Sequence, residues 1–98
     1  FSERVKAEVI IVRLKIRMDE VRDRINELYL VIGRTVVDLA KKNDMPAETE
    51  QLLKHDDIVS AMNEIASRER ELEDLRSEIG QVRDAAKPQT KQAEDTTV

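Results

Sequence analysis

The feature that most constrains the fold of this chain is a hydrophobic repeat with steps of three and four residues. It runs through two long segments, which a helix-breaking patch at residues 43–46 separates. This spacing lines one side of an α-helix with apolar side chains, as in the seam of a coiled coil. The seam positions are Ala7, Ile11, Leu14, Met18, Val21, Ile25, Leu28, Ile32, Thr35 and Leu39, then Ile58, Ala61, Ile65, Arg68, Leu72, Leu75, Ile79, Val82 and Ala86.

The two segments predict an all-α fold, an antiparallel two-helix hairpin of the coiled-coil type. We expect a first helix over about 3–42, a turn at 43–47, and a second helix over about 47–86. Asn43 suits the left-handed end of the first helix, Asp44 suits an N-cap, and Pro46 suits a first helical turn. The polar residues 87–98 are expected to form a disordered tail.

The start of the second helix allows another interpretation. Leu52 and Leu53 do not share the phase of the repeat from Ile58 onward, so residues 46–57 are alternatively a separate turn of helix. In that case Asp56 and Asp57 are candidates to cap the longer segment.

The alignment of the two helices is open. Antiparallel seams match when opposed residue numbers add up to about 86, 93 or 100. The alignment near 93 opposes Met18 with Leu75. It also predicts two charge contacts, Arg22 with Glu69 and Arg24 with Glu71. The alignment near 86 matches the charges equally well, so the sequence does not choose.

The composition is typical of a single helical, coiled-coil-like domain, with 98 residues, 39% charged and 2% aromatic. The net charge of −4 is divided: residues 1–42 carry +3 and residues 43–98 carry −7, which favours pairing of the helices. A lone hairpin has a single thin contact layer. We therefore expect it to dimerise into an elongated four-helix bundle.

Helix 1 carries a second apolar stripe on the side away from the seam. It consists of Val5, Val9, Val12 and Ile16, and Tyr29, Val36 and Val37 widen the apolar face further along, where Gly33 allows close approach. A two-helix hairpin does not cover both sides of one helix, so we predict that these residues form a partner interface. The expected partner is a second copy of the chain, with another helical protein as the alternative.

The start of the first helix also allows an alternative function, binding to a membrane surface. Lys6, Arg13, Lys15 and Arg17 surround the aliphatic stripe and resemble the basic face of a membrane-surface helix. The alternative is therefore a peripheral membrane or membrane-complex accessory protein. No apolar run approaches the ~20 residues of a membrane span. The location of the protein is open, with the cytoplasm favoured.

Residues with catalytic or metal-binding chemistry are sparse. The chain has no cysteine and one histidine, His55, which lies beside Asp56 and Asp57 and predicts a capping cluster rather than a metal site. The sequence has no Glu-x-x-His pairs and no Gly-rich phosphate loop. We expect no cofactor, no metal and no enzymatic activity. With a pI near 5.1 and no aromatic-interleaved basic patch, we also expect no nucleic-acid partner.

Helical chorismate mutases, which are about this long and open with a long helix, provide the one enzyme comparison. Arg17 and Arg34 have a separation similar to that of their pocket-lining arginines. That family has three helices, however, and this chain lacks its second-helix Arg-Glu pair and its late Gln. We therefore still expect no enzymatic activity.

Two short sequence patterns resemble features of known proteins. The stretch from Glu27 to Arg34, followed by a turn and then by Glu64 to Ile79, resembles the coiled-coil hairpin of small uncharacterised bacterial proteins, many of which carry a zinc ribbon. Without cysteines this chain has no such ribbon, and the resemblance implies no activity. The end of the sequence, Thr96-Thr97-Val98, matches a C-terminal peptide of the kind that PDZ domains bind.

Overall fold

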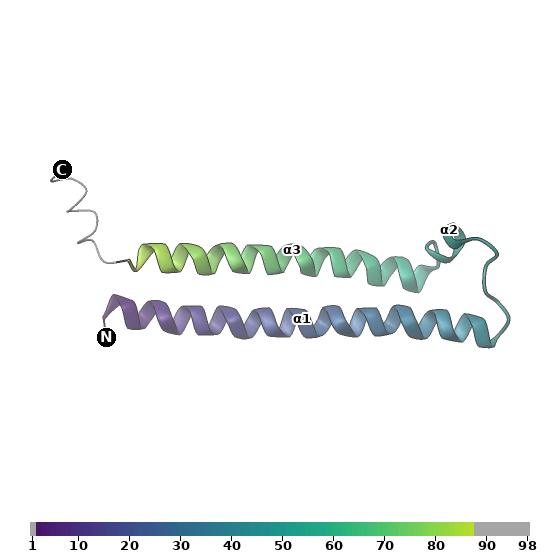
Figure 1. Cartoon of the computed structure of the whole chain (residues 1–98), viewed down its shortest axis with the longest axis horizontal. Helices are drawn as coiled ribbons and strands as arrows, with labels where there is room; N and C mark the ends of the chain where they lie inside the picture. The colour runs from purple at the N-terminus through teal and green to yellow at the C-terminus, as the bar shows by residue number, and fades with distance from the viewer. Residues whose placement is uncertain (1, 88–98) are drawn as a thin grey trace.

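The computed structural model describes residues 2–87, which fold into an antiparallel hairpin of two long helices (Figure 1). The elements are α1 (Glu3–Lys41), α2 (Thr49–Leu52) and α3 (Asp56–Ala85). At ~1.5 Å per residue, α1 is about 60 Å long, so the hairpin is a rod. The described residues contain no strand. The predicted all-α class, with two long helices in contact, is confirmed.

Local hydrogen bonds fix both ends of α1. At its start, the side chain of Ser2 accepts a hydrogen bond of 3.2 Å from the backbone N–H of Val5, which is a standard N-cap. At its end, Asn43 takes a left-handed conformation with φ 57°. The Asn43 N–H donates to the carbonyl of Ala40 at 3.2 Å, and the Asp44 N–H donates to that of Leu39 at 2.9 Å. This is a Schellman motif, and it confirms the predicted role of Asn43.

The second half of the hairpin differs from the single helix expected over 47–86. It is divided into α2 and α3, as the out-of-phase leucines allowed. Three expectations about the helix starts, for Asp44, for Pro46 and for the pair Asp56 and Asp57, were wrong. Asp44 and Pro46 precede the next helix by several residues, and Glu48 occupies the N-cap of α2 without a side-chain hydrogen bond. Asp56 and Asp57 lie in the first turn of α3, while His55 caps it.

The N-cap of α3 explains why the chain starts a new helix at this point. The Nδ1 atom of His55 accepts a hydrogen bond of 3.3 Å from the Asp57 N–H. Asp56 and Asp57 then place negative charge at the positive end of the helix dipole. The expected capping cluster around His55 is therefore confirmed.

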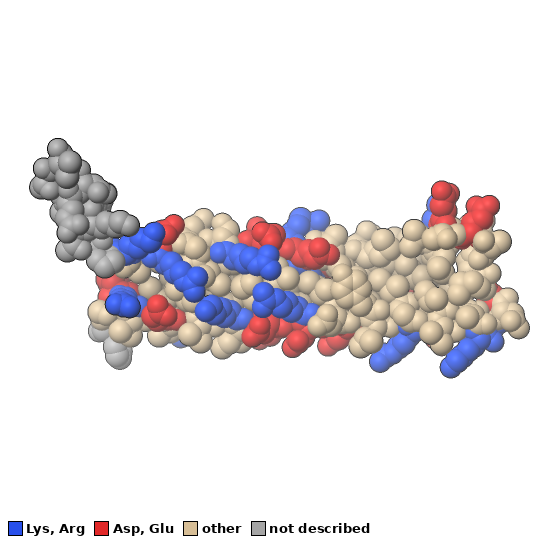
Figure 2. Space-filling view, in the orientation of Figure 1, with Lys and Arg blue, Asp and Glu red and all other residues tan. Residues whose placement is uncertain are grey.

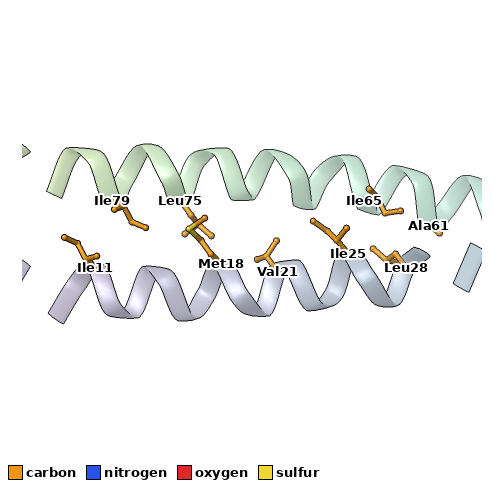
Figure 3. Packing of buried hydrophobic residues seen from close by; sticks show 9 residues of the cluster. All are labelled: Ile11, Met18, Val21, Ile25, Leu28, Ala61, Ile65, Leu75 and Ile79. Carbon is orange, nitrogen blue, oxygen red and sulfur yellow. The ribbon is translucent and has the colours of Figure 1, made fainter. Parts of the chain in front are cut away.

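The core is a single apolar seam between α1 and α3. Its buried members are Ile11, Met18, Val21, Ile25, Leu28, Ala61, Ile65, Leu75 and Ile79, shown in Figure 3. Leu14, Ile32, Leu72 and Val82 are half-buried against this cluster, and Ile58 is buried beside the turn. No polar or charged residue is buried within residues 2–87. The seam therefore holds the hairpin together by hydrophobic burial.

The structure selects one of the predicted alignments. Met18 points toward Leu75, and Leu28 lies opposite Ile65 (Figure 3). These are the contacts of the alignment near 93. The charge contacts expected with it were wrong, however: Arg24 pairs with Glu64, and Arg22 pairs with Asp19 on its own helix. An arginine side chain spans about one helical turn, so the seam alone does not decide which glutamate it reaches.

Charge is unevenly distributed along one face of the rod. Figure 2 shows Lys, Arg, Asp and Glu side chains crowded along both helices at the end where the chain begins. Toward the loop the same face is largely uncharged. The two ends of this face therefore offer different chemistry to a partner.

Candidate functional site

The candidate site is the face of α1 that points away from α3. Val5, Val9, Val12 and Ile16, here called the N-terminal stripe, are 44–54% exposed although all four side chains are aliphatic. The steps of four, three and four residues that join them keep the side chains on one side of the helix. Two shallow hollows lie along the stripe, bordered by the basic residues Arg4, Lys6 and Arg13.

The remaining predicted interface residues are divided between two environments. Tyr29 and Val37 are exposed, whereas Val36 is half-buried. Val36 therefore offers a partner less surface than the other two. Gly33 is exposed, and a Cβ atom added there would meet nothing within 4 Å. The hairpin itself therefore does not require a glycine at this position.

Leu30, which is not among the predicted interface residues, is 56% exposed. Leu30, Gly33 and Val37 follow Val9, Val12 and Ile16 at a distance of 21 residues, or three heptads. They share the face of the N-terminal stripe, and we call them the second patch. The heptad spacing of the sequence is the pattern that could have identified Leu30 as part of this face. Asp19, Asp23 and Asn26 occupy the same face between them, so the apolar surface is interrupted at its middle.

A network of ion pairs occupies one flank of the seam. Arg24 donates from Nε and Nη2 to the two carboxylate oxygens of Glu64, at 2.7 and 2.9 Å. Arg17 also crosses between the helices, but its Nε and Nη2 both contact one oxygen of Glu71, Oε2, at 3.0 and 2.9 Å. Arg68 joins the two glutamates, at 3.4 Å from Glu64 and 2.9 Å from Glu71. Arg68, at a seam position where the repeat is otherwise apolar, is therefore paired with two neighbouring acids of its own helix.

The ion pairs of this network shift the pKa values of four of its residues. The hydrogen bond from Arg24 lowers the pKa of Glu64, and that from Arg68 lowers the pKa of Glu71. The same contacts raise the pKa values of Arg24 and Arg17, through Glu64 and Glu71 respectively. Glu64, Glu71, Arg17 and Arg24 are therefore held in their charged forms. The ion pairs that cross between α1 and α3 favour one alignment of the two helices. None of these four groups has a pKa shifted toward neutral pH.

Within residues 2–87, no group of three or more His, Cys, Asp or Glu side chains is arranged to hold a metal ion. No helix among these residues has the length and apolar character needed to cross a bilayer. Arg17, considered in the enzyme comparison, is engaged by Glu71 and Glu20. The C-terminal peptide pattern at Thr96–Val98 lies outside the described residues.

Comparison of the chain with known protein families, curated proteins and solved structures finds no match. The resemblance to bacterial coiled-coil hairpin proteins therefore stays a prediction.

Proposed function

We propose that this chain is a structural or protein-interaction module that associates with a second copy of itself through the outer face of α1. The observation that carries the proposal is the exposed N-terminal stripe on a helix whose other side is already packed against α3. Contiguous aliphatic patches of this kind are typical of surfaces that a partner covers.

The form of the assembly follows from the hairpin. If α1 of one copy packs against α1 of another through this face, the two α3 helices lie on the outside and the product is an elongated assembly of four helices. The second patch supplies further apolar contact, and Gly33 permits the two backbones to approach closely. The acidic interruption at Asp19 and Asp23 opposes some alignments of the two copies and thereby contributes to specificity.

The test places two charges in the stripe. In the double variant Val9→Asp and Val12→Asp, the proposed interface would have to bury unpaired carboxylates, so we expect a monomer with helicity largely unchanged. Light scattering coupled to size exclusion measures the oligomeric state, and circular dichroism measures the helicity.

A matched control adds the same charge elsewhere. Ser67→Asp with Ser77→Asp introduces two carboxylates at exposed positions of α3, and this variant should remain a dimer. A wild-type chain that is monomeric at all accessible concentrations would show that the self-association proposal is wrong.

A further inference from the structure

The two flanks of the α1–α3 seam differ in how their charges are balanced. On the flank of Arg17 and Arg24, ion pairs to Glu71 and Glu64 cross between the helices. On the opposite flank lies a groove that we call the basic groove. It is lined by Lys15, Asp19 and Arg22 of α1, and by Arg76, Gly80 and Arg83 of α3, above Met18 and Ile79.

No ion pair within residues 2–87 crosses between the helices over this groove. Arg22 pairs with Asp19 and Arg76 with Glu73, each on its own helix and exposed. Such exposed pairs contribute little to stability, so an anion of higher charge can replace the carboxylates. Lys15 and Arg83 form no ion pair with any described residue.

The shape of the groove leaves room between these cations. Met18 and Ile79 form an apolar floor, and both are buried. Gly80 contributes no side chain to the wall, and a Cβ atom added there would meet nothing within 4 Å. The groove has a volume of about 500 Å³ and is open to solvent.

Basic residues continue beyond the groove toward the open end of the hairpin. Arg83 also borders a second hollow, together with Arg4, Glu8 and Lys87. Figure 2 shows Lys and Arg side chains along both helices at this end, with Asp and Glu side chains among them. From Arg22 to Arg4 the distance along α1 is about 27 Å, at roughly 1.5 Å per residue. The chain as a whole carries −4, so a basic surface here does not follow from its composition.

We propose that the basic groove between α1 and α3 binds a ligand that carries several phosphate groups, either a free polyphosphate or the phosphorylated headgroup of a lipid. Arginine favours this chemistry because its planar guanidinium donates two parallel hydrogen bonds to one phosphate. Basic side chains of α1 and of α3 would then each bind a different phosphate of the same ligand. No aromatic side chain lines the groove, so base stacking contributes nothing and a nucleic acid is not the expected ligand.

The groove lies beside the seam, whereas the N-terminal stripe lies on the back of α1. The two surfaces share the border residues Asp19 and Arg4, but the two tests change different side chains, so each proposal can fail without the other.

The experiment uses the full chain and two probes. Isothermal titration calorimetry with inorganic tripolyphosphate tests the free ligand. Co-sedimentation with phosphatidylcholine vesicles, with and without phosphatidylinositol phosphate, tests the lipid headgroup. In the variant Lys15→Gln with Arg83→Gln, we expect affinity for the bound probe to fall about tenfold or more, because two charge-assisted contacts are lost.

The control variant is Arg34→Gln with Arg70→Gln, which removes the same charge from exposed positions outside the groove. It should bind nearly as well as the wild type. Tripolyphosphate binding with this dependence on the groove supports a free ligand, and vesicle binding with the same dependence supports a lipid. Absence of binding to both probes, equal losses in the two variants, or tighter binding of polyglutamate than of tripolyphosphate would overturn the proposal.

Discussion

At the scale of single residues, Glu64 and Glu71 connect the two helices most directly. Each accepts from one arginine of α1 and also from Arg68 of α3. Arg68 occupies a seam position where an apolar residue would normally lie, and its pairing with both acids explains how a charge is accommodated there. The half-buried guanidinium replaces hydrophobic contact with hydrogen bonds.

These glutamates predict a dependence of stability on pH. Their pKa values are lowered in the folded chain, so the stabilisation is present above the ordinary glutamate pKa and is lost as the pH falls through the lowered values. The variant Glu64→Gln with Glu71→Gln should therefore be less stable than the wild type at pH 7. The difference should shrink as the pH falls below about 4. Thermal unfolding followed by circular dichroism measures both.

Glu69→Gln with Glu78→Gln is the matched control. Both residues are exposed on α3 and form no ion pair within the described residues. A stability gap between the wild type and the Glu64/Glu71 variant that stays constant from pH 7 to pH 3 would contradict the role assigned to the network.

At the scale of helices, the break between α2 and α3 decides where the returning helix begins. Leu52 is half-buried, while Leu53 is exposed, and the backbone turns before His55 caps α3. The four-residue α2 is too short to be stable alone, so its position depends on its neighbours. The cap at His55 is thus a local contribution to the stability of α3.

Replacement of His55 tests this cap. His55→Ala removes the side-chain acceptor for the Asp57 N–H and should lower the free energy of unfolding by about 0.5–2 kcal/mol. His55→Asp supplies a better acceptor and should restore or exceed the wild-type value. Urea denaturation at pH 7 measures both variants. If Asp proves no better than Ala, the hydrogen bond to Asp57 is not what stabilises this helix start.

At the scale of the whole molecule, the rod has an inner seam that is covered and an outer face on α1 that is not. The two glycines lie on different surfaces of the hairpin: Gly33 is on the outer face of α1, and Gly80 is in the basic groove. Each occupies a helix interior, where glycine is less favourable than alanine by about 0.5–1 kcal/mol. Neither is needed for packing within one hairpin.

The two glycines therefore form a matched pair of tests. Gly80→Ala should raise the free energy of unfolding by about 0.5–1 kcal/mol and leave the oligomeric state unchanged. Gly33→Ala should bring the same gain within one hairpin but weaken self-association, because the added methyl separates the two α1 backbones. Sedimentation equilibrium measures the association. Equal dimer affinities for both variants would show that Gly33 does not lie at a close contact between copies.

The sequence by itself determined the features that depend on neighbours within one or two helical turns. The heptad spacing predicted which residues form the seam, and Asn43 predicted the left-handed end of α1. The exposure of Val5, Val9, Val12 and Ile16 followed from the same periodicity, although their partner stays a prediction.

Only the tertiary structure decided how the helices align and what lies beside the seam. A shift of seven residues leaves an antiparallel seam matched, so the repeat cannot distinguish Leu75 from other partners of Met18. The choice of Glu64 by Arg24, and the convergence of Lys15 and Arg83 on one groove, require side chains from distant parts of the chain to be placed together. That placement depends on the packing of both helices along their whole contact.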